Sequence, residues 1–401
     1  MTVMLALTLG SCNKPDNDGS IIGCEHTSSD WIVESVPTEA SDGYKYKTCL
    51  TCGVKTEEKI IEYVENPGIL YEVNPDGKTC TVTGIGSFTG TELEIPEYID
   101  GYKVTSIGSS AFRGCSSLTS IFIPDSVTSI GAAAFWCCSA LTSIVIPDSV
   151  TSIGFRAFDG CSALTSVVIP DGVTSIGDYM FHECSSLTSI VIPDSVTSFG
   201  YYAFHGCSSL TSIVIPEGVT SIGNWAFDFC ISLTSITIDA NNPNYKSIDG
   251  NLYTKDGKTL IQYAIGKTDK SFVIPDSVTS IGNDAFEWCS ALTSIEIPDS
   301  VTSIGYYAFH GCSSLTSIVI PEGVTSIGDW AFEGCSSLTS IVIPDSVTSI
   351  GSFAFAGCSS LTSIVIPDSV TSIGSSAFED CSSLTSIVIP DSVTSIGKQA
   401  F

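Results

Sequence analysis

The chain has 401 residues, with 15 Lys and Arg against 43 Asp and Glu, so its formal net charge is −28. This charge argues against nucleic acid or anionic lipid as a partner and favours a strongly solvated exterior. Apolar residues make up 43% of the sequence, which is ample for a core. No internal stretch is apolar for long enough to span a membrane.

Residues 1–12 form a short apolar segment that ends Leu9-Gly10-Ser11-Cys12. This segment resembles a bacterial lipoprotein signal peptide and lipobox, in which Cys12 is lipidated, and residues 13–22 then form a polar tether. No Lys or Arg precedes the apolar run, which a start site assigned too late would explain. The alternative is an accidental apolar N-terminus. We predict an exported lipoprotein at the cell surface or outer membrane, whose membrane contact is only this lipid anchor.

A small Cys/His module is expected over residues 23–65. Cys24 and His26 lie upstream of a C-x-x-C knuckle made by Cys49 and Cys52. Such a set supplies four ligands for a tetrahedral structural zinc and looks like a zinc-ribbon-like module. The alternative in an oxidising compartment is a Cys49–Cys52 or Cys24–Cys49 disulfide. Either arrangement is structural, because four protein ligands leave no open position for chemistry.

Residues 66–103 are expected to form a cap on the N-terminal side of a repeat array. Two strand-like runs, Tyr71–Val73 and Thr79–Val82, flank Asn74-Pro75-Asp76-Gly77, which is a strong β-hairpin signal. The sequence therefore predicts an N-terminal β cap.

A 23-residue unit repeats over residues 104–238 and 275–401, and the copies at 201–223 and 306–328 are identical. Its apolar positions predict a strand around Leu118–Ile123, which Pro124 ends, and then a corner at Gly131. We expect a single helical turn at Ala134-Phe135. One unit cannot bury these side chains alone, so the units must stack as a solenoid with parallel, in-register strands. The sequence ends inside a repeat, so we expect a longer array.

An insert interrupts the repeats at residues 239–274. The repeat proline returns every 23 residues from Pro124 to Pro216 and then only at Pro275. Tyr253-Thr254-Lys255-Asp256-Gly257-Lys258-Thr259-Leu260 predicts a second hairpin within the insert. The insert is either a binding protrusion or a spacer that bends the array. We expect one continuous parallel sheet on both sides of it.

The pattern I-P-x-x-V-x-x-I-G-x-x-A-F-x-x-C, as it runs from Ile123 to Cys138, resembles the BspA-like leucine-rich repeats of bacterial and some protist cell surfaces. The resemblance covers most of the chain. It implies a β-rich α/β leucine-rich-repeat solenoid, curved, with a parallel sheet on its inner side. It also implies adhesion or ligand binding outside the cell and no catalysis.

Eleven of the 17 cysteines occupy one repeat position, which predicts a buried column of unreactive thiols. Disulfides between neighbouring repeats are the weaker interpretation, because parallel in-register side chains do not readily reach the required dihedral angle. The column comprises Cys115, Cys138, Cys161, Cys184, Cys207, Cys230, Cys289, Cys312, Cys335, Cys358 and Cys381.

The positions that vary between repeats are the places where a partner can be recognised. The two positions after the repeat glycine are rich in aromatic residues, and exposed aromatic rings are good anchors for proteins or glycans. Alternatively, the rings pack on one another and cover the rim of the core. The candidate ligand-binding residues are Tyr201, Tyr202, Trp225, Tyr306, Tyr307 and Trp330.

The position after Ala-Phe carries Asp159, His182, His205 and Asp228 in four consecutive repeats. Either a divalent metal or a pH-dependent contact would suit this column, and a solvated edge is the plainer interpretation. No nucleophile–base pair, phosphate loop or catalytic carboxylate dyad is apparent, so we expect no enzymatic activity.

These patterns predict a surface protein that binds host or neighbouring-cell macromolecules, chiefly extracellular proteins. A Ser/Val face of the sheet, with Ser143 and Val145 repeated, suits extended protein ligands. The alternative is a glycan-capture lipoprotein that serves a transport system, since rows of aromatic rings suit sugars.

Overall fold

The computed structural model describes residues 14–15, 21–22, 32–35, 43–48, 55–61 and 65–401. Cys12, Cys24, His26, Cys49 and Cys52 lie outside these ranges, so the lipobox and the zinc-ribbon-like module stay predictions. Before residue 65, β1 (Lys14–Pro15) pairs antiparallel with β2 (Ile21–Ile22). β3 (Ile32–Ser35), β4 (Gly43–Thr48) and β5 (Lys55–Ile61) form an antiparallel three-stranded sheet.

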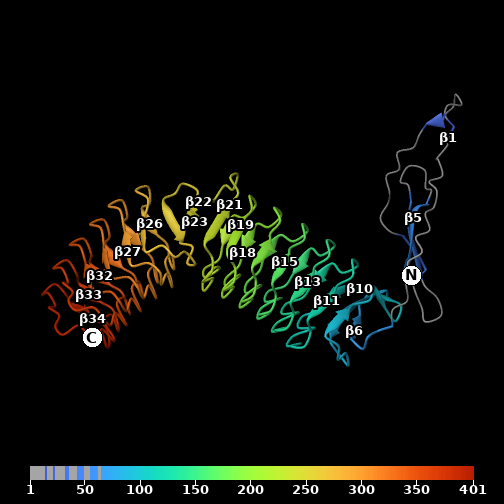
Figure 1. The fold of residues 1–401 in the computed structure, drawn as a ribbon, viewed down its shortest axis with the longest axis horizontal. Helices are drawn as coiled ribbons and strands as arrows, with labels where there is room; N and C mark the ends of the chain where they lie inside the picture. The colour runs from blue at the N-terminus through green and yellow to red at the C-terminus, as the bar shows by residue number, and fades with distance from the viewer. Residues whose placement is uncertain (1–13, 16–20, 23–31, 36–42, 49–54, 62–64) are drawn as a thin grey trace.

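The repeats stack into an arc in which the turns contribute strands to two rows, and the last two turns have a strand only in the second row (Figure 1). Between neighbouring 23-residue units the paired residues of both rows are 23 apart, as in Ser120↔Ser143 and Ser129↔Ser152. The first row comprises β8 (Glu92–Glu94), β11 (Ser120–Phe122), β13 (Ser143–Val145), β15 (Ser166–Val168), β17 (Ser189–Val191), β19 (Ser212–Ile215), β21 (Ser235–Ile238), β25 (Ser271–Val273), β27 (Ser294–Glu296), β29 (Ser317–Val319) and β31 (Ser340–Val342).

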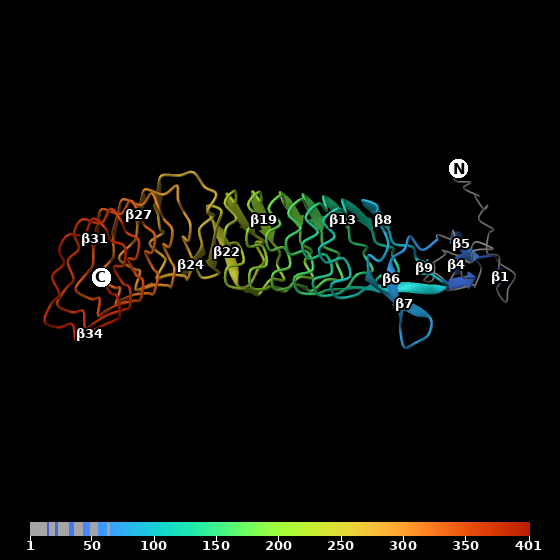
Figure 2. The same ribbon diagram turned by 90° about the horizontal axis from the view of Figure 1, so that it is seen from below.

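The second row consists of shorter strands on the other side of each turn. Seen from below the arc, the two rows run along opposite edges of the molecule rather than along its inner side (Figure 2). The second row comprises β7 (Thr79–Gly84), β10 (Tyr102–Ile107), β12 (Ser129–Ile130), β14 (Ser152–Ile153), β16 (Ser175–Ile176), β18 (Ser198–Phe199), β20 (Ser221–Ile222), β24 (Thr259–Gln262), β26 (Ser280–Ile281), β28 (Ser303–Ile304), β30 (Ser326–Ile327), β32 (Ser349–Ile350), β33 (Ser372–Ile373) and β34 (Ser395–Ile396).

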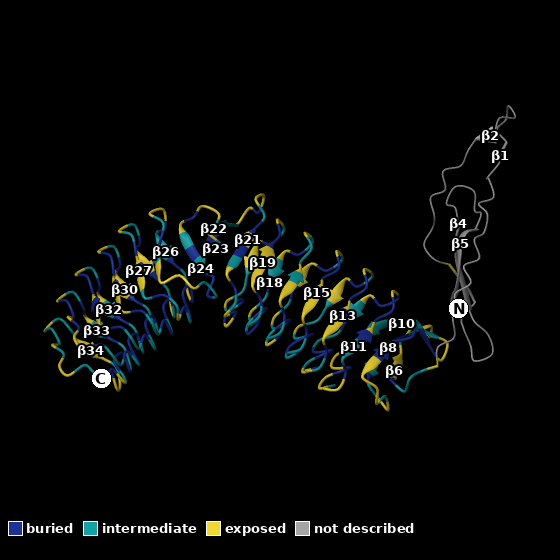
Figure 3. Cartoon of the chain, in the orientation of Figure 1, coloured by how far each residue is buried: buried dark blue, intermediate teal, exposed yellow. Residues whose placement is uncertain are grey.

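Each first-row strand alternates as the sequence predicts. Ile144 is buried, whereas Ser143 and Val145 on either side of it are exposed. The strand stops at Pro147, and the backbone N–H of Val150 closes the next turn by donating to the Pro147 carbonyl at 3.0 Å. The outward residues of this row form the exposed stripe visible on the strands in Figure 3.

The core is a stack of repeat side chains that forms two clusters, one on each side of the insert. Phe112, Phe135, Phe158, Phe181 and Phe204 are fully buried, and consecutive rings lie 5.4–5.7 Å apart and nearly parallel. This spacing is slightly wider than the strand spacing of about 4.8 Å. The aromatic column therefore holds neighbouring repeats in register from within.

The helical turn predicted at Ala134-Phe135 is wrong, and the described residues contain no helix. Ser110, two residues after the repeat glycine, has φ +58°, and Gly114 has φ +73°. A positive φ at the third residue is the signature of type II turns, and it breaks a helix. Two such turns, closed by Ala111 N–H to Gly108 and by Cys115 N–H to Phe112, replace the helix.

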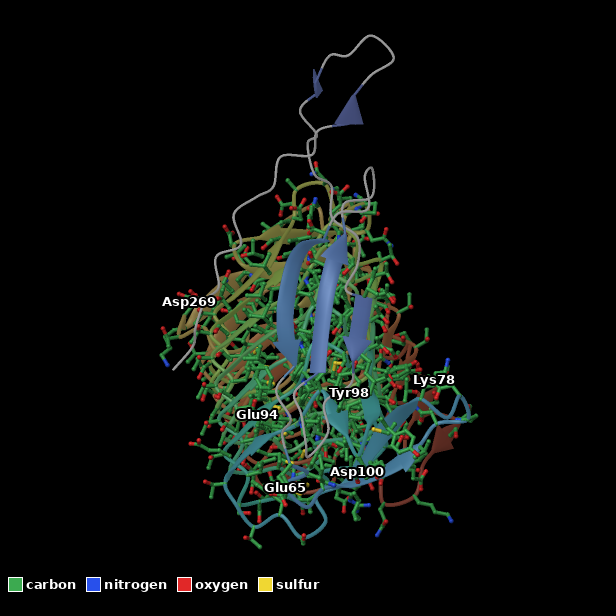
Figure 4. All side chains as sticks on the ribbon, turned by 90° about the vertical axis from the view of Figure 1, so that its right-hand side faces the viewer. Glu65, Lys78, Glu94, Tyr98, Asp100 and Asp269 are labelled. Carbon is green, nitrogen blue, oxygen red and sulfur yellow. The ribbon has the colours of Figure 1, made fainter. Side chains whose placement is uncertain are left out.

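The N-terminal cap is the predicted β hairpin. β6 (Leu70–Val73) pairs antiparallel with β7, whose other edge pairs with β10 and so joins the second row. β9 (Tyr98–Ile99) folds back on β10 through Asp100 and Gly101, both at positive φ, and Tyr71 donates a hydrogen bond to Asp100 at 2.7 Å. Figure 4 looks onto this end of the solenoid, with Lys78 at the outer tip of the hairpin. The cap thus covers the first core cross-section.

The insert contains the predicted hairpin, β23 (Asn251–Thr254) with β24, and a further strand, β22 (Tyr245–Ile248), paired with β23. β24 takes a repeat position by pairing in parallel with β26. In the first row, however, strands pair only within β8–β17, β19–β21 and β25–β31, so the prediction of one continuous sheet is wrong. At the insert the reason is that the Gly250 carbonyl accepts the N–H of Ile236, so the β22–β23 hairpin occupies the free edge of β21.

Candidate functional site

The two positions after the repeat glycine, here slot one and slot two, carry the candidate aromatic residues. Every slot-two residue of the repeats has a φ of 52–59°, yet none of them is glycine. A left-handed backbone costs an L-residue roughly 1–2 kcal/mol. The repeats keep side chains in slot two against this cost. The slot-two residues are Ser110, Ala133, Arg156, Tyr179, Tyr202, Trp225, Asp284, Tyr307, Trp330, Phe353, Ser376 and Gln399.

The slot-two rings form an aromatic ladder in two halves. Tyr179, Tyr202 and Trp225 stack with centroids 4.9 and 5.1 Å apart, and the Arg156 guanidinium lies 4.3 Å from the Tyr179 ring. On the other side of the insert, Tyr307, Trp330 and Phe353 stack at 4.9 and 5.6 Å. The rings are half-buried, and each packs on its neighbour and still shows an edge to solvent, so their role in binding stays a prediction.

A groove of about 320 Å³ separates the two halves of the ladder. It exists because Asp284 occupies slot two between Trp225 and Tyr307, where a ring would complete the stack. We call it the seam groove, since the repeats on either side of the insert meet there. Its lining residues are Asn224, Trp225, Asn283, Asp284, Tyr306, Tyr307, Asp329 and Trp330.

The structure thus brings together four of the six candidate residues, Trp225, Tyr306, Tyr307 and Trp330. Tyr202 lies one step back in the ladder, and Tyr201 is an exposed slot-one ring away from the groove lining. Four further lining residues were not predicted from the sequence: Asn224, Asn283, Asp284 and Asp329. The available signal was the single acidic residue that interrupts an otherwise aromatic run of slot two.

Asp284 lines the seam groove, and its carboxyl group interacts electrostatically with those of Asp228 and Glu287. Burial and the neighbouring Glu287 raise the pKa of Asp284 to about 7, against an opposing hydrogen bond from Trp225. Burial and Glu287 likewise raise the pKa of Asp228 to about 7. One oxygen of Asp284 and one of Glu287 are buried without a hydrogen-bond partner. The seam groove is therefore lined by one carboxyl group, Asp284, whose pKa is raised towards neutrality.

The outward face of the first row carries a second surface, which we call the valine row. One valine per repeat is 58–80% exposed, and an acidic residue, also exposed, stands three positions later in each of these repeats. Thr237 and Glu296 occupy the same strand position beside the insert. The members are Val145, Val168, Val191, Val214, Val273, Val319, Val342, Val365 and Val388, with Phe122 at the N-terminal end.

Ten of the eleven cysteines in the column are buried as predicted, Cys115 is partly buried, and all 13 cysteines in the described part of the chain are free thiols. Each thiol from Cys138 onward in an unbroken repeat donates to the carbonyl of a phenylalanine 26 residues earlier, as Cys161 does to Phe135 at 3.2 Å. Burial raises the pKa of Cys138 and of Cys312 to about 12. The column is structural, since thiols held in the neutral form are poor nucleophiles.

Comparison with solved structures identifies the class of protein to which the chain belongs. The chain is similar to a leucine-rich cell surface protein from Faecalibacterium prausnitzii A2-165, with 38% identity over 81% of this chain and 93% of that chain and a TM-score of 0.68. It is also similar to a leucine-rich-repeat protein from Bacteroides ovatus, with 36% identity, 84% and 91% coverage and a TM-score of 0.57. The pneumococcal vaccine antigen PcpA shares the fold at 24% identity, with 83% and 93% coverage and a TM-score of 0.71. The molecule is thus a leucine-rich-repeat solenoid.

The family model described as "BspA type Leucine rich repeat region (6 copies)" matches residues 83–211, 174–259 and 266–352. The chain belongs to this BspA-type leucine-rich-repeat family. No curated protein matches it. Among the described residues, none belongs to a helix that could cross a membrane.

Proposed function

We propose that this chain is a cell-surface protein that binds an extended protein ligand of a host or neighbouring cell along its valine row. The valine row is the observation that carries the proposal. The outward positions of a solvated antiparallel or single-layer sheet are usually polar, and contiguous exposed apolar side chains mark interaction sites. Here an exposed valine recurs along the array, spaced as the strands are.

The chemistry beside the valine row restricts the ligand. The exposed serines, such as Ser143 and Ser166, offer hydroxyl groups to polar backbone, and the acidic column gives the face a negative border. The net charge of −28 adds long-range attraction for positive charge. The proposed ligand is therefore an extended segment with apolar and basic side chains, as fibrous matrix proteins provide.

Two further features support a place at the cell surface. The Faecalibacterium relative is described as a cell surface protein, and residues 1–12 resemble a lipoprotein signal with Cys12 as the anchor. In this proposal the tether and the module with Cys24, His26, Cys49 and Cys52, which we propose to hold a structural zinc, carry the solenoid away from the membrane. Radiolabelled palmitate incorporated into the wild type but not into Cys12→Ser would support the anchor.

The test of the proposal is direct binding of the purified chain to a panel of extracellular-matrix proteins beside a glycan array. We expect binding on the protein panel that Val145→Lys, Val191→Lys and Val214→Lys together abolish. The side chains point outward and Glu296 already places a charge at this strand position, so the melting temperature should hold. Absence of protein binding, or full binding by the triple variant, would contradict the proposal.

The alternative, glycan capture, is favoured by one specific observation, the seam groove. Its aromatic walls suit the apolar faces of a sugar ring, and its Asn and Asp side chains suit the hydroxyl groups. The identical units supply a matched pair, because Tyr306 lines the groove and its counterpart Tyr201 does not. If glycan capture is the function, Tyr306→Ala lowers glycan binding and Tyr201→Ala leaves it unchanged.

A further inference from the structure

Two histidines and a glutamate from consecutive repeats lie together in the turns that connect each second-row strand to the next first-row strand. His182 and His205 occupy the position after Ala-Phe in neighbouring repeats, and their rings stack with centroids 4.9 Å apart. Glu183 is the next residue after His182. One ligand atom from each of the three side chains lies within 4.8 Å of the others.

Each histidine has a buried carboxylate on its far side. His182 Nδ1 lies 2.9 Å from Asp159 Oδ1, and His205 Nε2 lies 3.5 Å from Asp228 Oδ2. Both aspartates are buried. The hydrogen bond to Asp159 fixes the tautomer of His182 and leaves the lone pair of its other ring nitrogen free, which is the usual second shell of a metal-binding histidine, whereas Asp228 is only an ion-pair partner of His205.

The Nδ1 atom of His205 faces Glu183 but makes no hydrogen bond. This atom is buried, and the nearest carboxylate oxygen, Glu183 Oε1, is 3.8 Å away. Such a buried acceptor is costly to leave unpaired. A cation between Glu183 and His205 would satisfy both groups.

Glu183 stands where the fold prefers glycine. It has φ +56°, and the same position is Gly114, Gly160, Gly206, Gly311, Gly334 or Gly357 in six other repeats. The next repeat makes room for its carboxylate, since a Cβ added to Gly206 would lie 2.9 Å from the Glu183 carboxyl carbon. Cys137, Phe229, Trp288 and Asp380 share this position and a positive φ, so what distinguishes Glu183 is its carboxylate beside His205.

We propose that His182, Glu183 and His205 bind a divalent borderline metal ion, Zn²⁺ being the expected one. Two imidazoles and one carboxylate suit Zn²⁺ better than Ca²⁺ or Mg²⁺, which prefer all-oxygen sites. In a tetrahedral site with bonds of about 2.1 Å, ligand atoms are about 3.4 Å apart, so binding draws the three side chains together by about 1 Å. Three protein ligands leave one coordination position of the metal open. This position lies near solvent, because the Glu183 side chain is 54% exposed. This metal site is independent of the proposed ligand binding along the valine row.

The second copy of the same unit provides an internal control. His310 has the same local sequence as His205, but its preceding repeat offers Glu287 and Trp288 in place of His182 and Glu183. Both ring nitrogens of His310 therefore face carboxylates, Glu287 at 2.8 Å and Glu333 at 3.6 Å. His310 has no second imidazole beside it, so the proposal assigns it no metal.

The test is the number of Zn²⁺ ions that the full chain binds, measured by isothermal titration after chelation. Any zinc held by the N-terminal cysteines is common to every variant, so differences between variants report this site alone. We expect Glu183→Gly and His182→Ala each to lose one ion per chain relative to wild type, and His310→Ala to lose none. Equal stoichiometry in wild type and both site variants, or loss of the same ion in His310→Ala, would overturn the proposal.

Protein stability separates ligand loss from misfolding. Glu183→Gly restores the residue that the positive φ favours, so the metal-free variant should melt at or above the wild-type temperature. Zn²⁺ should then raise the melting temperature of wild type more than that of Glu183→Gly. An equal rise in both proteins would contradict metal binding at Glu183.

Discussion

Replacing Trp330 by alanine and, separately, by glycine tests whether the slot-two side chains are kept against backbone strain. The Trp330 ring stacks on Tyr307 at 4.9 Å and on Phe353 at 5.6 Å. Each such pair contributes about 0.5–1.5 kcal/mol, so either replacement should cost about 1–3 kcal/mol from lost stacking. The two variants lose the same ring and differ only at the backbone.

The backbone contribution differs between the two variants. Trp330 has φ +56°. Alanine retains a cost of roughly 1–2 kcal/mol there, whereas glycine removes it and loses about 0.5–1 kcal/mol through its freer unfolded chain. Trp330→Gly should therefore be more stable than Trp330→Ala by about 0.5–1 kcal/mol.

Native-state hydrogen exchange is the suitable assay, because repeat stability is mainly local and a 401-residue array need not unfold in one step. The reporting amide is Phe332, whose N–H donates to Ala354 at 2.8 Å across the next repeat. Its opening free energy should fall in both variants, and further in Trp330→Ala. Equal protection in the two variants, or better protection with alanine, would refute the strain argument.

The core and the seam groove give three other predictions. Phe204→Ala and Phe309→Ala, in the two identical units, should each lower the local stability by about 3–5 kcal/mol, because both rings are fully buried. Hydrogen exchange of the flanking repeats measures this loss, and a loss below about 1 kcal/mol would contradict the prediction. The raised pKa of Asp284 means that the folded state holds its proton more tightly than the unfolded state, so wild-type stability should fall as pH rises from about 4 to about 7. Asp284→Asn should therefore melt above wild type at pH 8 and level with it near pH 4, and a constant difference across that range would count against the buried acid. Under native conditions a maleimide should label the exposed Cys137 and spare Cys312, and mass spectrometry that finds Cys312 modified would refute the closed thiol column.

The repeated fold was predictable because one rule recurs in every unit. Alternation around Ile144 gives the strand, Pro147 ends it, and the 23-residue period gives the register. Stacking then adds the same contacts at each step, so one correct interpretation of the unit extends through the array. The β cap and the insert hairpin were also predictable, because Asn-Pro-Asp-Gly and Lys-Asp-Gly are local turn signals.

The errors arose where the backbone departs from local preference. Ala134-Phe135 suits a helix by composition, but Ala133 beside it adopts φ +53°, which its side chain does not favour. Only the hydrogen bonds to the next repeat, such as Phe135 N–H to Ala157 at 2.8 Å, stabilise that conformation. Contacts of this kind are not encoded in the unit taken alone.

The seam groove was only half predictable for the same reason. Trp225 and Tyr307 are separated by the whole insert in sequence, and the period predicts that both lie in slot two. It does not predict that β22–β24 bring their repeats to either side of Asp284. The proposed ligand Glu183 was not predicted, because no sequence motif marks it and four other repeats also carry a side chain at its position.

The most direct test of the central claim, recognition along the valine row, is biolayer interferometry of three proteins against one matrix ligand. The proteins are wild type, the triple lysine variant at Val145, Val191 and Val214, and Tyr306→Ala in the seam groove. The account predicts that the triple variant loses binding at an unchanged melting temperature, whereas Tyr306→Ala binds as wild type does. Loss of binding in Tyr306→Ala with full binding by the triple variant would contradict the claim and assign recognition to the groove.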